Sequence, residues 1–194
     1  MDTKLTGKTR IESDLIGARE IPAEALYGVQ TLRGIENFSI SKFRLSEYPL
    51  FIKGLAITKM AAAMANFELG LLTVEQKDAI IAACGEILDG KHHDQFPVDM
   101  IQGGAGTTTN MNANEVIANR ALELMGHERG EYQYCSPNDH VNCSQSTNDA
   151  YPTAIHIGMY FKHLQLLPHL EELIASFRKK GEEFSQIIKM GRTQ

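Results

Sequence analysis

The sequence of 194 residues predicts an all-α protein. Apolar residues recur at three- to four-residue spacing in four stretches, which is the period of an amphipathic helix. Three of these stretches stop at a glycine, the residue that most often ends a helix. The last stretch covers about 40 residues, far more than a strand would. We expect, besides these helices, one or two short strands between Ile11 and Arg33.

The first two helices are predicted to form a hairpin, to which we assign a structural role and no part in a site. One begins at about Pro49 and ends at Gly70. The next is capped by Thr73, with Gln76 three positions later completing a capping box, and it ends at Gly90. Upstream of this hairpin we expect a mobile N-terminus as far as residue 11. Three polar residues that follow could face a site, but we interpret them as surface residues: Gln30, Thr31 and Arg33.

A glycine-rich stretch, residues 102–114, precedes the third helix. We expect that helix to start at Asn110 or Asn112 and to end at Gly126. The stretch lacks the Gly-Lys-Ser/Thr of a nucleotide-binding P-loop, and no strand is predicted before it, so we expect no nucleotide cofactor. Two interpretations remain open: a glycine turn with capping threonines, or a hydroxyl-lined pocket for a small anion.

Residues 136–149 are polar almost throughout and precede the fourth helix. Asp, Asn, Ser and Thr before a helix are typical of N-terminal caps. The start of a helix also has free N–H groups and partial positive charge, which suit a carboxylate or a phosphate. Fourteen such positions exceed what a cap needs. The stretch therefore indicates a small-anion site, with simple capping as the alternative.

The fourth helix is predicted from about Asn148 to Ile188, with a kink at Pro168. At about 1.5 Å per residue it would be roughly 60 Å long, longer than a small domain is wide. Its apolar stripe needs helices from elsewhere to cover it. We therefore expect an N-terminal fragment of a longer, oligomeric protein, with a helical domain over residues 1–140 and the start of a helical bundle over 141–194.

Composition restricts the function classes further. A net charge of −5 without a basic block argues against nucleic acid as the main partner. The chain shows neither a signal peptide nor a run of about 20 apolar residues, so we expect a cytoplasmic protein without a membrane segment. Three cysteines without Cys-x-x-Cys spacing predict neither disulfides nor zinc. His92, His93 and His140 lack the spacing of a metal site, and we expect no metal.

Taken together, six strings resemble the aspartase/fumarase superfamily in the same order along essentially the whole chain. They are residues 26–33, 102–107, 110–116, 137–142, 144–149 and 189–194. Ser-Thr-Asn at 146–148 and Gly-Arg-Thr-Gln at 191–194 are similar to the aspartate ammonia-lyase branch, whereas class II fumarases typically read Ser-Ser-Asn and Gly-Arg-Thr-His. Fumarases also carry a His where this chain has Ser136. The resemblance implies the first long helix of that fold's central bundle.

The resemblance implies reversible elimination of ammonia from L-aspartate to give fumarate, through an enediolate intermediate. By the same resemblance, Thr107, Ser146 and Thr147 are catalytic and hold the β-carboxylate. Asn148, Thr193 and Gln194 bind the substrate near its amino group. Neutral hydroxyl and N–H donors suit negative charge that develops only in the transition state.

The resemblance also implies what this sequence lacks. In the family, a serine on a flexible Gly-Ser-Ser loop is the base, a Lys and an Asn of that loop bind the α-carboxylate, and three subunits of a homotetramer form each site. The loop is absent from these residues, so we expect no lyase activity from this chain alone. The alternatives are a class II fumarase and a helical oligomerisation fragment without catalysis.

Overall fold

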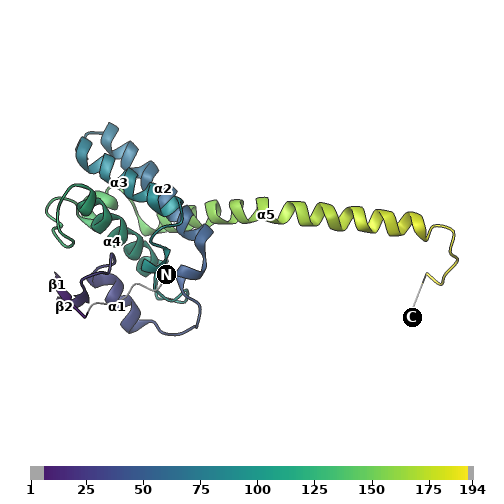
Figure 1. Cartoon of the computed structure of the whole chain (residues 1–194), viewed down its shortest axis with the longest axis horizontal. Helices are drawn as coiled ribbons and strands as arrows, with labels where there is room; N and C mark the ends of the chain where they lie inside the picture. Colours follow the sequence, from purple (N-terminus) through teal and green to yellow (C-terminus); the bar gives the residue numbers. More distant parts are fainter. Residues whose placement is uncertain (1–6, 192–194) are drawn as a thin grey trace. The chain divides into compact units, whose positions relative to one another are not determined.

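The computed structural model describes residues 7–191 and is predominantly helical, which confirms the predicted all-α class (Figure 1). Its strands are β1 (Thr9–Asp14) and β2 (Gly17–Pro22). Its α-helices are α1 (Val29–Asn37), α2 (Pro49–Glu68), α3 (Val74–Leu88), α4 (Thr107–Leu124) and α5 (Thr147–Glu183). Three short helical turns complete the secondary structure of residues 7–191: η1 (Leu45–Glu47), η2 (His93–Gln95) and the π-helical η3 (Pro137–Val141).

The chain divides into two compact units, Met1–Gly158 and Met159–Gln194. The first unit contains every element from β1 to η3, together with the first three turns of α5. The second contains the rest of α5. The start of α5 is therefore part of the first unit's packing, while the expected domain boundary at residue 140 stays a prediction about the whole protein.

Helices α2, α3 and α4 supply most of the core of the first unit (Figure 1). The α2–α3 hairpin is confirmed, and so is its capping box: the Gln76 N–H donates to Thr73 Oγ at 3.2 Å, and the Thr73 N–H donates to Gln76 Oε1 at 3.1 Å. By length and composition α2 could cross a membrane, but seven of its residues are buried against the other helices. Burial of apolar area, at about 25 cal/mol per Å², explains the cohesion of these helices.

The N-terminal strands form an antiparallel hairpin, which confirms the expected short strands. Thr9 pairs with Pro22 and Asp14 with Gly17. Asp14 Oδ1 closes the turn by accepting hydrogen bonds from the N–H groups of Ile16 and Gly17, at 2.9 and 3.2 Å. Residues 9–11 are therefore ordered by pairing, where local composition predicted a mobile segment. Residues 1–6 lie outside the described part.

Helix α5 continues through Pro168 without interruption. The expected kink at this proline stays a prediction. The helix ends at Glu183, before the expected Ile188. In the second unit its apolar side chains are exposed, among them Met159, Leu166, Leu170, Leu173, Ile174 and Phe177. That other helices cover this stripe stays a prediction.

Candidate active site

The two polar stretches of the sequence meet in the first unit. Helix α4 begins at Thr107 and α5 begins at Thr147. Asn110, one turn into α4, donates a hydrogen bond from Nδ2 to Thr147 Oγ at 3.3 Å. The ring of Tyr151, one turn into α5, lies against Gly106, directly before α4. Two hydroxyl-bearing helix N-termini are therefore neighbours, and the partial positive charge of such ends suits an anionic ligand. Part of the α5 start is already capped, because Ser146 Oγ accepts from the Asn148 N–H at 3.2 Å.

Helix α4 begins at Thr107, three residues before the earlier of the two expected starts. Asn110 and Asn112 are buried inside the helix and do not cap it. The cap comes from the glycine-rich loop itself: Gln102 accepts from the Thr109 N–H at 2.8 Å and donates to Thr109 Oγ at 2.7 Å. Gly106 has a φ of +84°, and a Cβ there would overlap the Tyr151 ring, so only glycine fits.

Thr107 borders a cavity of about 740 Å³ in the first unit. Polar residues from several segments line it with Thr107, among them Asp14, Gln30, Arg33, Glu115, Ser136 and Asn138. Among the described residues, Ser146, Thr147 and Asn148 do not line this cavity. Ser146 and Asn148 are exposed and Thr147 is half-buried, so all three are open to a ligand at the start of α5. Thr193 and Gln194 lie outside the described residues.

A buried polar network lies beneath the start of α5. Lys59 of α2 is fully buried, and its Nζ donates to Asn142 Oδ1 and to Gln145 Oε1, each at 2.9 Å. Asn110 Nδ2 also donates to Asn142 Oδ1, at 3.0 Å. Sequence reasoning gave no site role to Lys59 or Asn110. The burial of Lys59 could have been predicted from its position, because it is a charged residue within the apolar stripe of α2.

The chemical state of Lys59 follows from its burial. Burial lowers the pKa of its ammonium from 10.5 to about 7. Burial also raises the pKa of the Cys84 thiol to about 12, so this thiol is neutral near pH 7 and offers Lys59 no counter-charge. Both acceptors of Lys59 are neutral amide oxygens. When Lys59 is protonated, below about pH 7, the network thus holds a cation next to the helix starts at a cost in stability.

This cost predicts a pH dependence. Between about pH 7 and pH 10, unfolded chains bind more protons at Lys59 than folded ones, because the pKa is about 7 in the fold and 10.5 outside it. The free energy of unfolding should therefore rise with pH in this window, by up to about 1.4 kcal/mol per pH unit. Below pH 7 the lysine is charged in both states and the cost is constant.

Urea unfolding of the parent chain and of Lys59→Met, at pH 6 to 9, measures this effect. The free-energy difference between parent and variant should shift in favour of the parent as the pH rises above 7. A difference that does not change with pH would contradict the assigned state of Lys59.

The η3 turn uses the polar residues at 136–140 to cap itself. Ser136 Oγ accepts from the Asp139 N–H at 3.1 Å, and the Ser136 N–H donates to His140 Nδ1 at 2.7 Å. Burial lowers the pKa of His140, in line with an unprotonated Nδ1. Residues 136–141 therefore form a self-capped turn. This turn precedes the start of α5, where Ser146, Thr147 and Asn148 lie.

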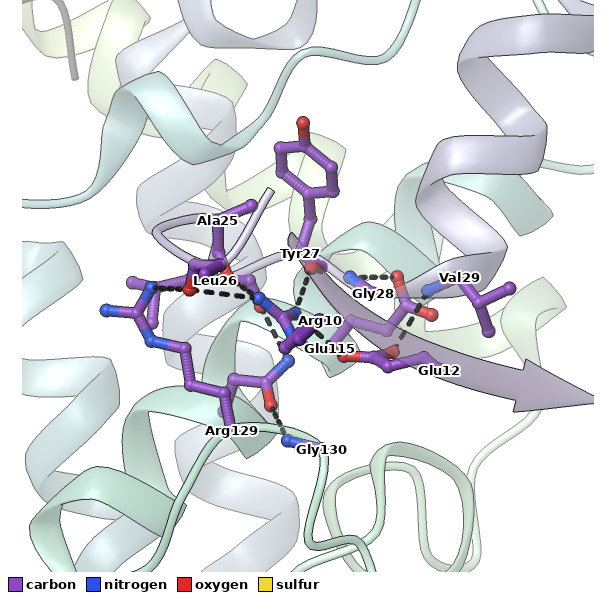
Figure 2. A network of polar contacts seen from close by, with 12 residues as sticks. Arg10, Glu12, Ala25, Leu26, Tyr27, Gly28, Val29, Glu115, Arg129 and Gly130 are labelled. Atoms are coloured by element: carbon purple, nitrogen blue, oxygen red, sulfur yellow. Dashed lines mark hydrogen bonds and ion pairs between the residues drawn. The ribbon is translucent and has the colours of Figure 1, made fainter. Parts of the chain in front are cut away.

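The start of α1 is also polar, but protein carboxylates already occupy it (Figure 2). Glu115 of α4 accepts from the N–H groups of Gly28, Gln30 and Thr31, at 2.8, 2.8 and 3.0 Å. Glu12 Oε2 accepts from the Val29 N–H at 3.1 Å. Burial raises the pKa of Glu115, and the three N–H donors oppose this. This helix start is consequently filled by the fold's own groups.

These contacts correct the surface interpretation of α1. Thr31 is fully buried, and Gln30 and Arg33 border the cavity. Arg33 is paired with Asp14, through Nε to Oδ2 and Nη2 to Oδ1, both at 2.8 Å. The partners are distant in sequence, so local pattern could not show that these side chains face inward.

The histidines flagged in the sequence contact protein groups. His92 Nε2 lies 2.7 Å from Glu86 Oε2, and His93 Nε2 lies 2.9 Å from the Ile87 carbonyl oxygen. Within residues 7–191 no group of three or more His, Cys, Asp or Glu is placed to hold a metal ion. Cys84, Cys135 and Cys143 are free.

Comparison with known proteins places the chain in a family. The family model described as Lyase matches residues 17–194, and the chain belongs to this lyase family. An aspartate ammonia-lyase of Pseudomonas canavaninivorans is 59% identical over 185 residues, covering 95% of this chain and 39% of that protein. The chain thus spans about 40% of the length of such relatives. The resemblance to the aspartase/fumarase superfamily is confirmed.

Solved structures agree with this family. A fumarate lyase:delta crystallin of Brucella melitensis bound to cobalt has a TM-score of 0.92 and 53% identity, over 96% of this chain and 41% of that one. A class II fumarase of Schistosoma mansoni has a TM-score of 0.87 and 38% identity, over 96% and 39%. The lower identity to the fumarase favours the aspartate ammonia-lyase branch.

Proposed function

We propose that the whole protein is an aspartate ammonia-lyase, which converts L-aspartate reversibly into fumarate and ammonia. The observation that carries this proposal is the meeting of two hydroxyl-bearing helix starts, at Thr107 and at Thr147, in a chain 59% identical to an aspartate ammonia-lyase. Two adjacent helix N-termini provide an environment suited to a dicarboxylate.

The chemistry to be catalysed is removal of a weakly acidic proton next to the β-carboxylate. The electron pair left on carbon delocalises into that carboxylate, which becomes an enediolate with two negative charges. Thr107, Ser146 and Thr147 donate hydrogen bonds to this group, and the bonds strengthen as charge develops. The carbon–nitrogen bond then breaks, giving fumarate and ammonia. Asn148, Thr193 and Gln194 bind near the leaving amino group.

The proposal assigns the base and the α-carboxylate ligands to parts of the protein beyond these 194 residues. The whole protein would be a cytoplasmic homotetramer with no required cofactor, each site combining segments of three subunits. The chain on its own is then expected to produce no fumarate from aspartate, as measured by the ultraviolet absorbance of the conjugated double bond. Measurable turnover by the chain alone would contradict this division of the site.

A substitution at Thr107 tests the proposed site. In the full-length protein, Thr107→Val is expected to reduce kcat about 100-fold, because it removes one donor to the enediolate. The control is Thr73→Val, which removes an N-terminal cap and costs about 1 kcal/mol of stability without approaching the site. Equal kcat in the two variants would exclude Thr107 from the reaction.

The alternative reaction is hydration of fumarate to malate, as in class II fumarases. The same carboxylate-binding framework would serve it, and the match to the Schistosoma mansoni fumarase favours keeping it as the second candidate. Initial rates of the full-length protein with aspartate and with malate decide between the two. Turnover of malate without turnover of aspartate would replace the proposed function.

A role without catalysis is motivated by the exposed stripe of α5. It would make this chain an oligomerisation element. Size-exclusion chromatography of the chain with light scattering tests this role, and a monomer at all concentrations would argue against it.

A further inference from the structure

The buried network beneath α5 has a defined hydrogen-bond direction. Asn142 Nδ2 faces the Gln145 backbone carbonyl at 3.1 Å, and a carbonyl oxygen only accepts. Its Oδ1 must therefore face the other way, towards Lys59 Nζ at 2.9 Å. Gln145 is oriented in the same manner, because its Nε2 donates to the Val141 carbonyl at 2.8 Å. Both amide orientations are thus determined by main-chain carbonyls.

This direction determines the orientation of Asn110. The Asn110 group that lies 3.0 Å from Asn142 Oδ1 must be a donor, and hence Nδ2. The second hydrogen of that NH₂ group is directed at Thr147 Oγ, 3.3 Å away. That distance is at the long end of the hydrogen-bond range. Asn110 is 1% exposed, so no solvent competes for the amide.

A threonine hydroxyl has one hydrogen to donate and two lone pairs that accept. Since Asn110 uses one lone pair of Thr147 Oγ, the Thr147 hydrogen is not drawn into the network. It can point out of the half-buried site at the start of α5, towards a bound carboxylate. Without the Asn110 amide, the hydroxyl would be free to rotate.

We propose that Asn110 is a positioning residue, which orients the Thr147 hydroxyl as a donor to the carboxylate of the substrate. This inference rests on the proposed function, because it requires a ligand with an anionic group at the start of α5. Asn110 does not touch the substrate itself. Its contribution passes through Thr147, and this indirect action distinguishes it from a merely structural asparagine.

A double-mutant cycle in the full-length protein tests the proposal. The variants are Asn110→Ala, Thr147→Val and the two combined. Asn110→Ala is expected to reduce kcat about 100-fold, the loss typical of a misplaced catalytic group, with a smaller change in KM. If Asn110 acts through the Thr147 hydroxyl, the combined variant loses no more activity than Thr147→Val alone.

Asn112 provides a matched control on the same helix. It is also fully buried, it donates through Nδ2 to the Gln95 carbonyl at 3.0 Å, and its Oδ1, like that of Asn110, has no hydrogen-bond partner among the described residues. Asn112→Ala therefore removes the same volume and the same kind of group. It should lower the melting temperature while kcat stays within about threefold of the parent value, since it does not reach Thr147.

Asn110→Asp supplies a second, isosteric test. A carboxylate only accepts, so the Thr147 hydroxyl would turn inward to donate to it. This variant should lose about as much activity as Asn110→Ala although the side chain keeps its size. Full activity of Asn110→Asp would overturn the proposal.

The remaining outcomes separate the two levels of inference. Independent, multiplicative losses in the cycle would overturn the role of Asn110 and leave the proposed function intact. A loss in Asn110→Ala with no loss in Thr147→Val would do the same. If the parent full-length protein turned over neither aspartate nor malate, the proposed function would fail, and the role of Asn110 would fail with it.

Discussion

Replacing Glu115 with alanine is expected to lower the free energy of unfolding by about 3–5 kcal/mol, because the change leaves buried backbone N–H donors without an acceptor. The carboxylate accepts from three backbone N–H groups at the start of α1. Figure 2 shows the one from Gly28. Gly28 and Thr31 are buried, so water cannot take over these bonds. Each buried donor left without an acceptor costs about 1–3 kcal/mol.

The matched control for this prediction is Glu123→Ala on the same helix. Glu123 pairs with Arg120 at 2.7 Å and with Arg129 at 2.6 Å, but a quarter of its side chain is exposed. Its loss should cost about 1 kcal/mol or less. Urea unfolding of the 194-residue chain, followed by circular dichroism, measures both variants. Similar losses for the two would show that Glu115 is not the anchor of α1.

Replacing Gly54 with valine is expected to destabilise the chain by about 3 kcal/mol, at the upper end of what overpacking costs. Gly54 lies in α2 where that helix meets α5, and a Cβ there would overlap the carbonyl oxygen of Ala154. A backbone oxygen cannot rotate aside as a side chain does. The two helices would have to separate, and the start of α5 would move with them.

Gly85 of α3 is the control for Gly54. It is also a glycine inside a helix, but apart from the adjacent backbone of its own helix no atom of the described residues lies within 4 Å of the position its Cβ would take. Gly85→Val should change the free energy of unfolding by less than about 0.5 kcal/mol, because the intrinsic helix propensities of the two residues differ little. Thermal unfolding of both variants compares them. Equal melting temperatures would contradict the close packing of α2 on α5.

These two positions matter because they hold the helices of the candidate site. Glu115 and Thr107 lie on the same helix, α4, and Glu115 fastens α1, whose Gln30 and Arg33 border the cavity. Gly54 allows the close approach of α2 and α5, which places Lys59 beneath Asn142 and Gln145. The site therefore depends on packing contacts that no single segment contains.

Much of the fold could be predicted from local sequence, because the forces involved act within one element. The capping box of Thr73 and Gln76 lies within four residues, and both of its hydrogen bonds are present. The hairpin of α2 and α3 could be predicted from the helical period of their apolar residues and from the glycine that ends each helix. The predicted start of α4 was wrong, because it considered only the residues next to the helix. Helix α4 starts at Thr107, since Gln102, seven residues before Thr109, accepts a hydrogen bond from the Thr109 N–H.

The sequence by itself determined the helical class, the polar stretches at 102–114 and 136–149, and the family resemblance that names Thr107, Ser146 and Thr147. Residue type and spacing carry these properties, since caps, glycines and motifs are read along the chain. Only the tertiary structure decided that Asn110 reaches Thr147, that Lys59 lies beneath both stretches, and that Thr31 is buried under Glu115. These arrangements rest on hydrogen bonds between residues that are 37 to 86 positions apart in the sequence. Contacts at such sequence separations leave no periodic pattern from which they could be predicted.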